Sequence, residues 1–308
     1  MNKHGRKINS ANPALIVWKR FLKNKLAVVG LILVFFVAML AVFADVLAPP
    51  SPDFPGIPGY NLQNWDNARA FPSREHIFGT DNLGRGLFER IVHGARISMV
   101  VGAVVVGIGL TVGVPLGTIA GYYGGTSDNL VMRFTDIILA MPNILLAIVI
   151  AAALGPGMLN VMIAIGFGAV PLYARTVRAM VMTVKEKDFV EAARSAGASD
   201  WRLLRKNILP NCTAPLIVEA TMGYGSAILA AAGLSFIGIG LQPPQPEWGA
   251  MLSEGRGQIL AGYWHTTFFP GLFIAIMVIA LNMMGDGLRD AFDPRLRGVQ
   301  SADKKVSK

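Results

Sequence analysis

The stretch that decides the fold is ISMVVGAVVVGIGLTVGVPLGTIAGY, which runs from Ile97 to Tyr122 without one charged side chain. This run exceeds the roughly 20 apolar residues that a helix needs to cross a bilayer. A helix also satisfies its own backbone hydrogen bonds in lipid. The whole chain has a matching composition: of 308 residues, 53% are hydrophobic and 15% charged, and the mean hydropathy is +0.49. About a quarter of residues carry charge in a soluble domain, so the stretch predicts a transmembrane helix in a membrane protein.

Other blocks of the chain are also long and nearly free of charge. Leu26 to Leu47 contains only Asp45, Thr213 to Leu241 only Glu219, and Tyr263 to Gly285 only His265. Ile137 to Ala174 contains no charged residue and is long enough for two helices, which Gly155-Pro156-Gly157 would separate by a turn. We therefore predict an all-α integral membrane protein with six transmembrane helices, at about 26–47, 97–122, 130–154, 158–174, 213–241 and 263–285.

The basic residues indicate the orientation, because Lys and Arg are retained on the cytoplasmic side of a membrane. All but six of the 28 Lys and Arg residues lie in residues 1–25, at Arg133, in the 175–212 loop or after Leu288. The six others are Arg69, Arg74, Arg85, Arg90, Arg96 and Arg256. We predict that the N-terminal segment 1–25, the 175–212 loop and the tail 291–308 are cytoplasmic. The net charge of +9 is explained by these membrane edges and does not indicate nucleic acid.

The segment 48–96 is then external, and its two halves differ in composition. Its first half is rich in proline and is expected to be irregular. In the second half, within 76–98, Gly79-Thr80-Asp81 is predicted to cap an amphipathic helix that lies at the membrane interface. The apolar side of this helix would carry Leu87, Phe88, Ile91 and Val92.

Motifs for enzyme chemistry are missing from the sequence. There is no G-x-x-x-x-G-K-[ST] loop to hold nucleotide phosphates, no H-E-x-x-H pair among the four histidines and no G-x-S-x-G elbow. The lone Cys212 rules out an intramolecular disulfide. We predict a chain that is not an enzyme and binds no metal and no cofactor. Any ATPase must be another chain.

Five glycines lie four residues apart, at Gly109, Gly113, Gly117, Gly121 and Gly125. This spacing forms a ridge along one face of a helix, where a second backbone can approach closely. The ridge is either an ordinary packing surface or a sliding surface for alternating access, and the pattern does not separate the two.

Several ionisable residues lie inside or near the predicted spans, where such groups are usually paired or functional. Arg133 and Asp136 are expected to pair on one helix face, and Asp286 lies at the end of the sixth span. Glu219 is interpreted either as a structural partner of a cytoplasmic-side arginine or as a residue near a translocation path. It leaves a proton-coupled secondary transporter as the alternative function, although matched repeats with broken helices are not evident.

The 175–212 loop has a helical pattern of its own. Residues 185–196 read as a polar amphipathic helix that ends at Gly197, a residue suited to the left-handed C′ position. Ser199 or Asp200 is expected to cap a second short helix, which Pro210 would close before the next span. Periodicity alone favours an amphipathic hairpin that lies on the membrane.

The succession Glu191-Ala192-Ala193, Gly197 and Leu209-Pro210 resembles the EAA loop of ABC importer permeases. That resemblance implies that the loop docks into a cleft of an ATPase subunit. The full pattern has an isoleucine two positions before the Leu-Pro pair, where this chain has Asn207, and Ile208 follows instead. The residues expected to couple to the ATPase are Glu191, Ala192, Ala193, Gly197, Asp200, Leu209 and Pro210.

Further segments, in the same order, resemble the C-type inner-membrane permease of dipeptide and oligopeptide ABC importers. They include residues 21–25, 79–85, 121–125, 234–238, 242–244, 247–249 and 285–290. The resemblance implies a first helix and an external segment added to a five-helix type I importer core over 97–290, in a bacterial cytoplasmic (inner) membrane. It also implies a second, similar permease, two ATP-binding subunits that use ATP and Mg, and an extracytoplasmic solute-binding protein. Peptides are the expected solute, since no His, Met and Cys cluster marks a metal path.

Overall fold

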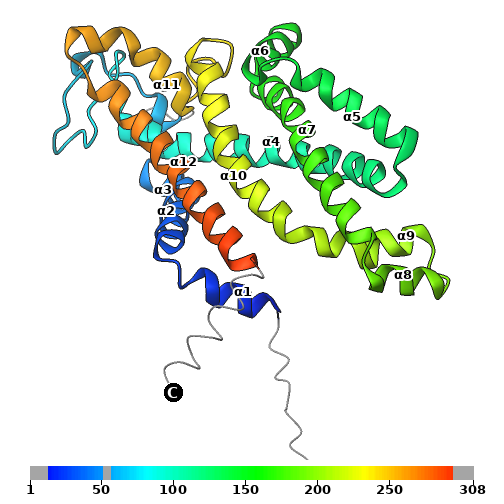
Figure 1. Ribbon diagram of the computed structural model, residues 1–308. Coiled ribbons are helices and arrows are strands. Elements are labelled where there is room, and N and C mark those ends of the chain that lie inside the picture. Colours follow the sequence, from blue (N-terminus) through cyan, green and yellow to red (C-terminus); the bar gives the residue numbers. More distant parts are fainter. Residues whose placement is uncertain (1–12, 51–56, 294–308) are drawn as a thin grey trace, which may run out of the picture.

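The computed structural model describes residues 13–50 and 57–293, which fold into a bundle of helices (Figure 1). The predicted cytoplasmic ends, 1–12 and 294–308, and most of the proline-rich segment, 51–56, lie outside the described residues. The helices are α1 (Pro13–Phe21), α2 (Lys25–Val42), α3 (Ala44–Leu47), α4 (Leu87–Tyr123), α5 (Gly125–Leu139), α6 (Asn143–Leu154), α7 (Met158–Lys185), α8 (Asp188–Ser195), α9 (Asp200–Leu203), α10 (Leu209–Phe236), α11 (Trp248–Gly255) and α12 (His265–Phe292). Short helical turns add η1 (Gly59–Asn61), η2 (Trp65–Asn67), η3 (Leu204–Ile208) and η4 (Arg256–Ala261).

Five helices in the described chain are long and apolar enough to span a membrane: α2, α4, α7, the continuous 200–236 helix and α12. The sixth candidate is the pair α5 and α6, which is bent by 87°. We predicted one span over 130–154, and in the structure the helix of this segment breaks at residues 140–142. Pro142 causes the break, since a proline disfavours helical geometry in the residue before it. The all-helical membrane fold itself is confirmed.

Helix α7 corrects a second boundary, since it continues to Lys185 where we predicted a span ending at 174. Its start after Gly155-Pro156-Gly157 agrees with the predicted turn, in which Gly155 has a φ of +86°. The error arose because charged residues were taken as the end of the span. Arg175 and Arg178 instead remain in the helix and pair with Asp136 and Asp128 of α5.

The segment before the second span also differs from our prediction, because the structure contains no separate interfacial helix there. Helix α4 begins at Leu87, after Gly86, and runs without interruption into the span. Leu87 and Ile91 are buried against Trp248 of α11 and Phe273 of α12. The apolar face that we assigned to the membrane interface therefore packs inside the protein.

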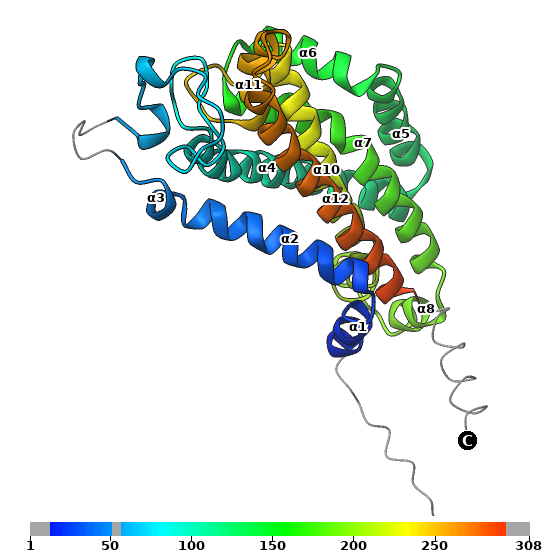
Figure 2. The ribbon, with the colours of Figure 1, turned by 90° about the vertical axis from the view of Figure 1, so that its left-hand side faces the viewer.

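Helix α2 lies along the outside of the bundle, as expected of a helix added to a core (Figure 2). Asn24 caps its start by accepting hydrogen bonds from the N–H groups of Leu26 and Ala27. Close approach to α12 depends on Gly30, where a β-carbon would lie 2.6 Å from the Ala280 carbonyl oxygen. Together, α1, the 186–208 segment and the end of α12 lie at one end of the bundle, and α11 and the 57–86 segment lie toward the other (Figures 1 and 2).

Candidate functional site

Residues 186–208 form a compact helical hairpin, which we call the 186–208 hairpin. Helix α8 is shorter than the predicted 185–196 helix, because α7 itself extends to Lys185. The chain then reverses at Gly197, whose φ of +84° is in the left-handed region that glycine adopts cheaply. Ser199 is the residue before α9, but its side chain makes no capping hydrogen bond.

The inner side of the hairpin is fully apolar. Val190, Leu203 and Ile208 are completely buried and pack with Val177 and Val181 of α7. Burial of such side chains contributes about 1.5–3 kcal/mol each. The hairpin is therefore held as a rigid extension of α7 and does not hang as a loose loop.

The outer side of the hairpin exposes the residues of the EAA-like pattern. Glu191, Ala192 and Gly197 are exposed, and the space around Gly197 is open. Two large apolar side chains accompany them: Trp201 is 70% exposed and Phe189 is 45% exposed. Exposed aromatic groups beside a carboxylate and small residues are typical of a protein–protein contact.

Leu209 and Pro210 correct the predicted end of the hairpin, because the helix continues through them into α10. The turn before them, η3, is a π-helix, in which the Leu209 N–H bonds to the Leu204 carbonyl. Such a widened turn accommodates Pro210, which lacks an N–H and would clash with the preceding turn of a regular helix. Ile208 points into the core, so Asn207 takes a more exposed place.

Polar contacts join the hairpin and the end of α7 to α4 and α5. The Tyr122 hydroxyl donates a hydrogen bond of 2.6 Å to Asp200 Oδ1. Lys185 Nζ donates one of 2.8 Å to the Gly121 carbonyl, and Arg178 Nη2 donates one of 2.6 Å to Asp128 Oδ2. The hairpin is thus bonded directly to α4 through Asp200, and α7, against which it packs, is bonded to α4 and α5.

Four of the five ladder glycines face α7. A β-carbon at Gly109 would overlap the Tyr173 ring, and one at Gly117 would overlap the Ala174 carbonyl. At Gly113 it would lie 2.7 Å from Tyr173 Cβ, and at Gly121 2.8 Å from the Arg178 carbonyl oxygen. Gly125 does not belong to this ridge, because α4 ends at Tyr123 and Gly125 begins α5 with a φ of +55° and open space around it.

The intramembrane charges are arranged differently from the predicted pairs. Asp136 pairs with Arg175 of α7 and not with Arg133, because the α5–α7 packing brings that guanidinium to it. Asp286 is exposed on α12. Glu219 is partly buried beside a cavity and makes no hydrogen bond or ion pair with the residues that the structure describes.

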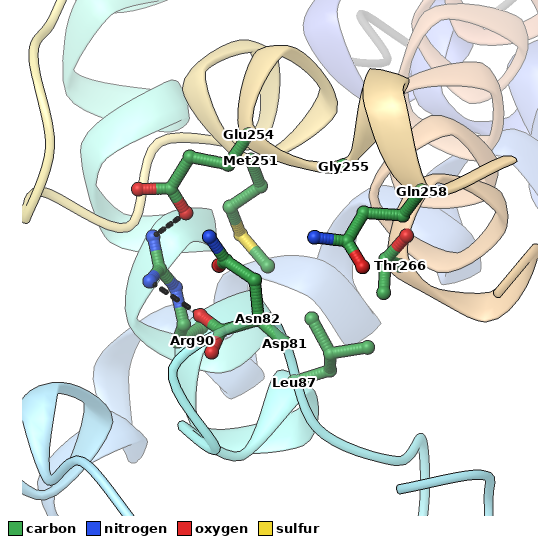
Figure 3. A pocket seen from close by; sticks show the side chains of 9 residues that line it. All are labelled: Asp81, Asn82, Leu87, Arg90, Met251, Glu254, Gly255, Gln258 and Thr266. Atoms are coloured by element: carbon green, nitrogen blue, oxygen red, sulfur yellow. Dashed lines mark hydrogen bonds and ion pairs between the residues drawn. The ribbon is translucent and has the colours of Figure 1, made fainter. Parts of the chain in front are cut away.

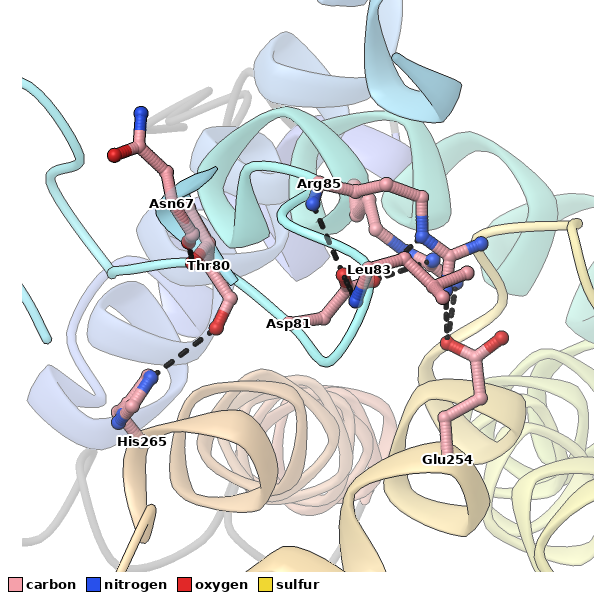
Figure 4. A network of polar contacts seen from close by, with 8 residues as sticks. Asn67, Thr80, Asp81, Leu83, Arg85, Glu254 and His265 are labelled. Carbon is pink, nitrogen blue, oxygen red and sulfur yellow. Dashed lines mark hydrogen bonds and ion pairs between the residues drawn. The ribbon is translucent and has the colours of Figure 1, made fainter. Parts of the chain in front are cut away.

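A buried charged cluster at the opposite end of the bundle was not predicted as a site. Arg85 Nε lies 2.6 Å from Asp81 Oδ2, and Arg90 Nη1 lies 2.9 Å from the same oxygen. Both guanidinium groups lie 2.9 Å from Glu254 Oε2 (Figures 3 and 4). The Arg90 contact to Glu254 lacks hydrogen-bond geometry and is electrostatic. Two acids and two bases thus neutralise one another and fix the 79–86 loop to α11.

The sequence signal for this cluster was the segment 79–85 itself, which we read as a helix cap. Asp81 instead folds the loop on itself, accepting hydrogen bonds from the N–H groups of Leu83 and Arg85. Glu247 performs a capping role at α11, where its carboxylate accepts from the N–H groups of Gly249 and Ala250. Burial raises the pKa of Glu247 above its usual value, against the effect of these hydrogen bonds.

Within residues 13–50 and 57–293, no group of three His, Cys, Asp or Glu side chains could hold a metal ion. The predicted lack of a cofactor stays a prediction. What the described residues do contain is a bundle of apolar helices with a compact hairpin that packs against α7 and is hydrogen-bonded to α4, the arrangement of a multi-pass membrane protein.

Comparison with known proteins identifies the family. Residues 113–298 match the family described as binding-protein-dependent transport system inner membrane component. Residues 12–72 match the N-terminal transmembrane domain of oligopeptide transport permease C. The chain belongs to the binding-protein-dependent transport system inner membrane component family.

Relatives resemble the chain over nearly its full length. The dipeptide transport system permease protein DppC of Alkalihalophilus pseudofirmus is 46% identical over 94% of this chain and 92% of its own. The glutathione transport system permease protein GsiD of Escherichia coli O157:H7 is 43% identical over 91% and 90%. A chain of the inward-facing MetNI methionine ABC transporter is 21% identical with a TM-score of 0.53 and covers 66% of this chain and 96% of its own, which shows a shared fold.

Proposed function

We propose that this chain is a permease subunit of an ATP-binding-cassette importer and forms half of a pathway that carries peptides across the cytoplasmic membrane. The observation that carries the proposal is the 46% identity to a dipeptide transport permease over more than nine-tenths of both chains. Di- and tripeptides or glutathione, named for the relatives, define the substrate class.

The 186–208 hairpin is proposed as the contact with the ATPase subunits, which would bind ATP and Mg in place of this chain. Its outer face supports this role, because Glu191 offers a charge, Ala192 permits close approach, and Phe189 and Trp201 supply apolar area. Gly197 sets the angle between α8 and α9. A second permease and an extracytoplasmic solute-binding protein complete the proposed assembly.

Alternating access would begin at this hairpin. Closure of an ATPase dimer displaces it, and the buried contacts of Val190 and Leu203 pass the movement to α7. The bond between Tyr122 and Asp200 passes it to α4. The close packing at the glycine ridge favours α4 and α7 moving as one body, because backbone carbonyl groups of α7 lie directly against the glycines of α4 and block sliding.

The orientation is part of the proposal: both termini and the hairpin face the cytoplasm, and the 57–86 segment faces outward. The hairpin and α1 lie at one end of the bundle, which agrees with a single cytoplasmic side (Figure 2). A single cysteine at exposed Gln63 or at exposed Ser199 tests it, after the buried Cys212 is replaced by alanine. An impermeant maleimide added to intact cells should label position 63 only. Labelling at position 199 would contradict the topology.

The ATPase contact is tested by cross-linking in the assembled importer. A cysteine at Ala192 should form a cross-link to the ATPase subunit, whereas one at Leu139, which lines the cavity between the helices, should not. Equal cross-linking at both positions, or none at Ala192, would contradict docking through the hairpin.

A further inference from the structure

A cavity of about 650 Å³ lies among α4, α6, α7, α10 and α12. Most of its wall is apolar. Its polar side chains are Asn143, Tyr173, Arg175, Glu219, Ser226 and Arg289. Glu219 and Arg289 also border an adjoining cavity of about 340 Å³. The two charged groups thus lie where the cavities meet.

Only some of the charged side chains that face this cavity have an ion-pair partner. Arg175 is neutralised by Asp136. Glu219 and Arg289 form no ion pair with each other, and neither has another ion-pair partner within the described chain. The nearest polar contact of Arg289 is a weak one, 3.6 Å from Nη2 to Met222 Sδ. Glu219 is half-buried and Arg289 is exposed, so both charges are open to the cavity, and a ligand that carries both opposite charges can pair with each.

Tyr173 provides a second, independent observation. Its side chain is 1% exposed and lines the cavity, and its hydroxyl group has no hydrogen-bond partner. The ring packs against Gly109 and the Cβ atom against Gly113, and the hydroxyl lies beside Gly223, where a β-carbon would be 2.5 Å from it. Gly223 is one helical turn after Glu219, so the free hydroxyl and the free carboxylate share one face of α10.

The spacing of the charges suggests what the ligand carries. Arg289 lies in the last turn of α12, and its Nη2 atom is 3.6 Å from Sδ of Met222, which follows Glu219 by three residues on α10. The two groups face one cavity and form no ion pair with each other, and a single small ion carries the counter-charge of only one of them. A zwitterion with separated charges neutralises both.

We propose that this cavity is a binding site for small zwitterions with free termini, in which Glu219 binds an ammonium group, Arg289 binds a carboxylate and the Tyr173 hydroxyl hydrogen-bonds the backbone between them. The proposal rests on the proposed function, since it gives the permease a residue-level contact with unmodified short peptides.

The test uses the purified importer with both permeases and both ATPase subunits, without the binding protein. Ser226 lines the cavity and is exposed, so a Ser226→Cys variant on a Cys212→Ala background reports on occupancy through its rate of modification by N-ethylmaleimide. Dialanine should slow the modification. N-acetyl-dialanine, which lacks the ammonium group, and dialanine amide, which lacks the carboxylate, should protect only at much higher concentration.

Glu219→Gln should raise the dialanine concentration for half-maximal protection about tenfold or more, because hydrogen bonds between charged groups are stronger than neutral ones. Arg289→Gln should do the same. Asp286→Asn is the matched control, because Asp286 is also exposed near the end of α12 but lines neither cavity. Dialanine should protect this variant as it protects the wild type. Intact complexes on size-exclusion chromatography confirm assembly of each variant.

Equal protection by dialanine and its capped forms, no protection by dialanine, or unchanged protection in Glu219→Gln would overturn the site. ATP-dependent uptake of di- and tripeptides by the same complex with binding protein is measured in parallel. Uptake without charge-specific protection would contradict the cavity site but would still support the importer function. Absence of uptake defeats the importer function itself.

Discussion

Gly113→Ala tests whether α4 and α7 are locked together at the glycine ridge. The added β-carbon would lie 2.7 Å from Tyr173 Cβ and 2.8 Å from the Val170 carbonyl oxygen, and ordinary contact begins at 3.4 Å. The helices must therefore separate by 0.6–0.7 Å, the difference between these distances. Neither neighbour is the end of a flexible side chain. Such overpacking costs typically about 1–3 kcal/mol.

Gly107→Ala is the matched control, because a β-carbon at that position of α4 meets nothing within 4 Å. Both changes also raise helix propensity by about 0.5–1 kcal/mol, so their difference isolates the packing. We expect the purified complex with Gly113→Ala to lose its monodisperse peak on size-exclusion chromatography at a lower temperature than the complex with Gly107→Ala. Equal midpoints for the two variants would refute the interlocked ridge.

Three further variants probe other contacts. Gly197→Val should insert at normal abundance but co-purify less ATPase, because a β-branched residue in the left-handed conformation costs about 1–2 kcal/mol; wild-type co-purification would count against hairpin docking. Tyr122→Phe removes the solvent-exposed hydrogen bond to Asp200, which contributes about 0.5–1.5 kcal/mol. This change should lower the ATP hydrolysis that loaded binding protein stimulates, while basal hydrolysis persists; unchanged stimulation would argue against this path of coupling. Glu254→Gln breaks the buried charged cluster at a cost of about 3–5 kcal/mol and should lower the thermal midpoint, whereas exposed Glu75→Gln should not.

The sequence predicted the helical membrane fold and the site of the hairpin because both depend on local properties. Long apolar runs make spans in any context, and a glycine after an amphipathic stretch marks a helix end, as at Gly197. The regular spacing of Gly109 to Gly121 likewise predicted a close-packed face.

Errors occurred where a distant partner decides the structure. Charged Arg175 and Arg178 stay inside α7 because α5 brings Asp136 and Asp128 to them. The apolar pattern of residues 87–92 is the same whether that face contacts lipid or α11. The cluster that joins Asp81 to Glu254 spans segments far apart in the chain, and no spacing rule connects them.

Transport in proteoliposomes tests the central claim most directly. The vesicles contain this chain, its partner permease and the two ATPase subunits. ATP is supplied on the side of the membrane that carries the ATPase subunits, and binding protein and radiolabelled dipeptide are supplied on the opposite side. We predict uptake that requires ATP and every subunit, and neither uptake nor ATP hydrolysis by this chain alone. Dipeptide accumulation by this chain alone under a proton gradient would contradict the importer and establish a secondary transporter.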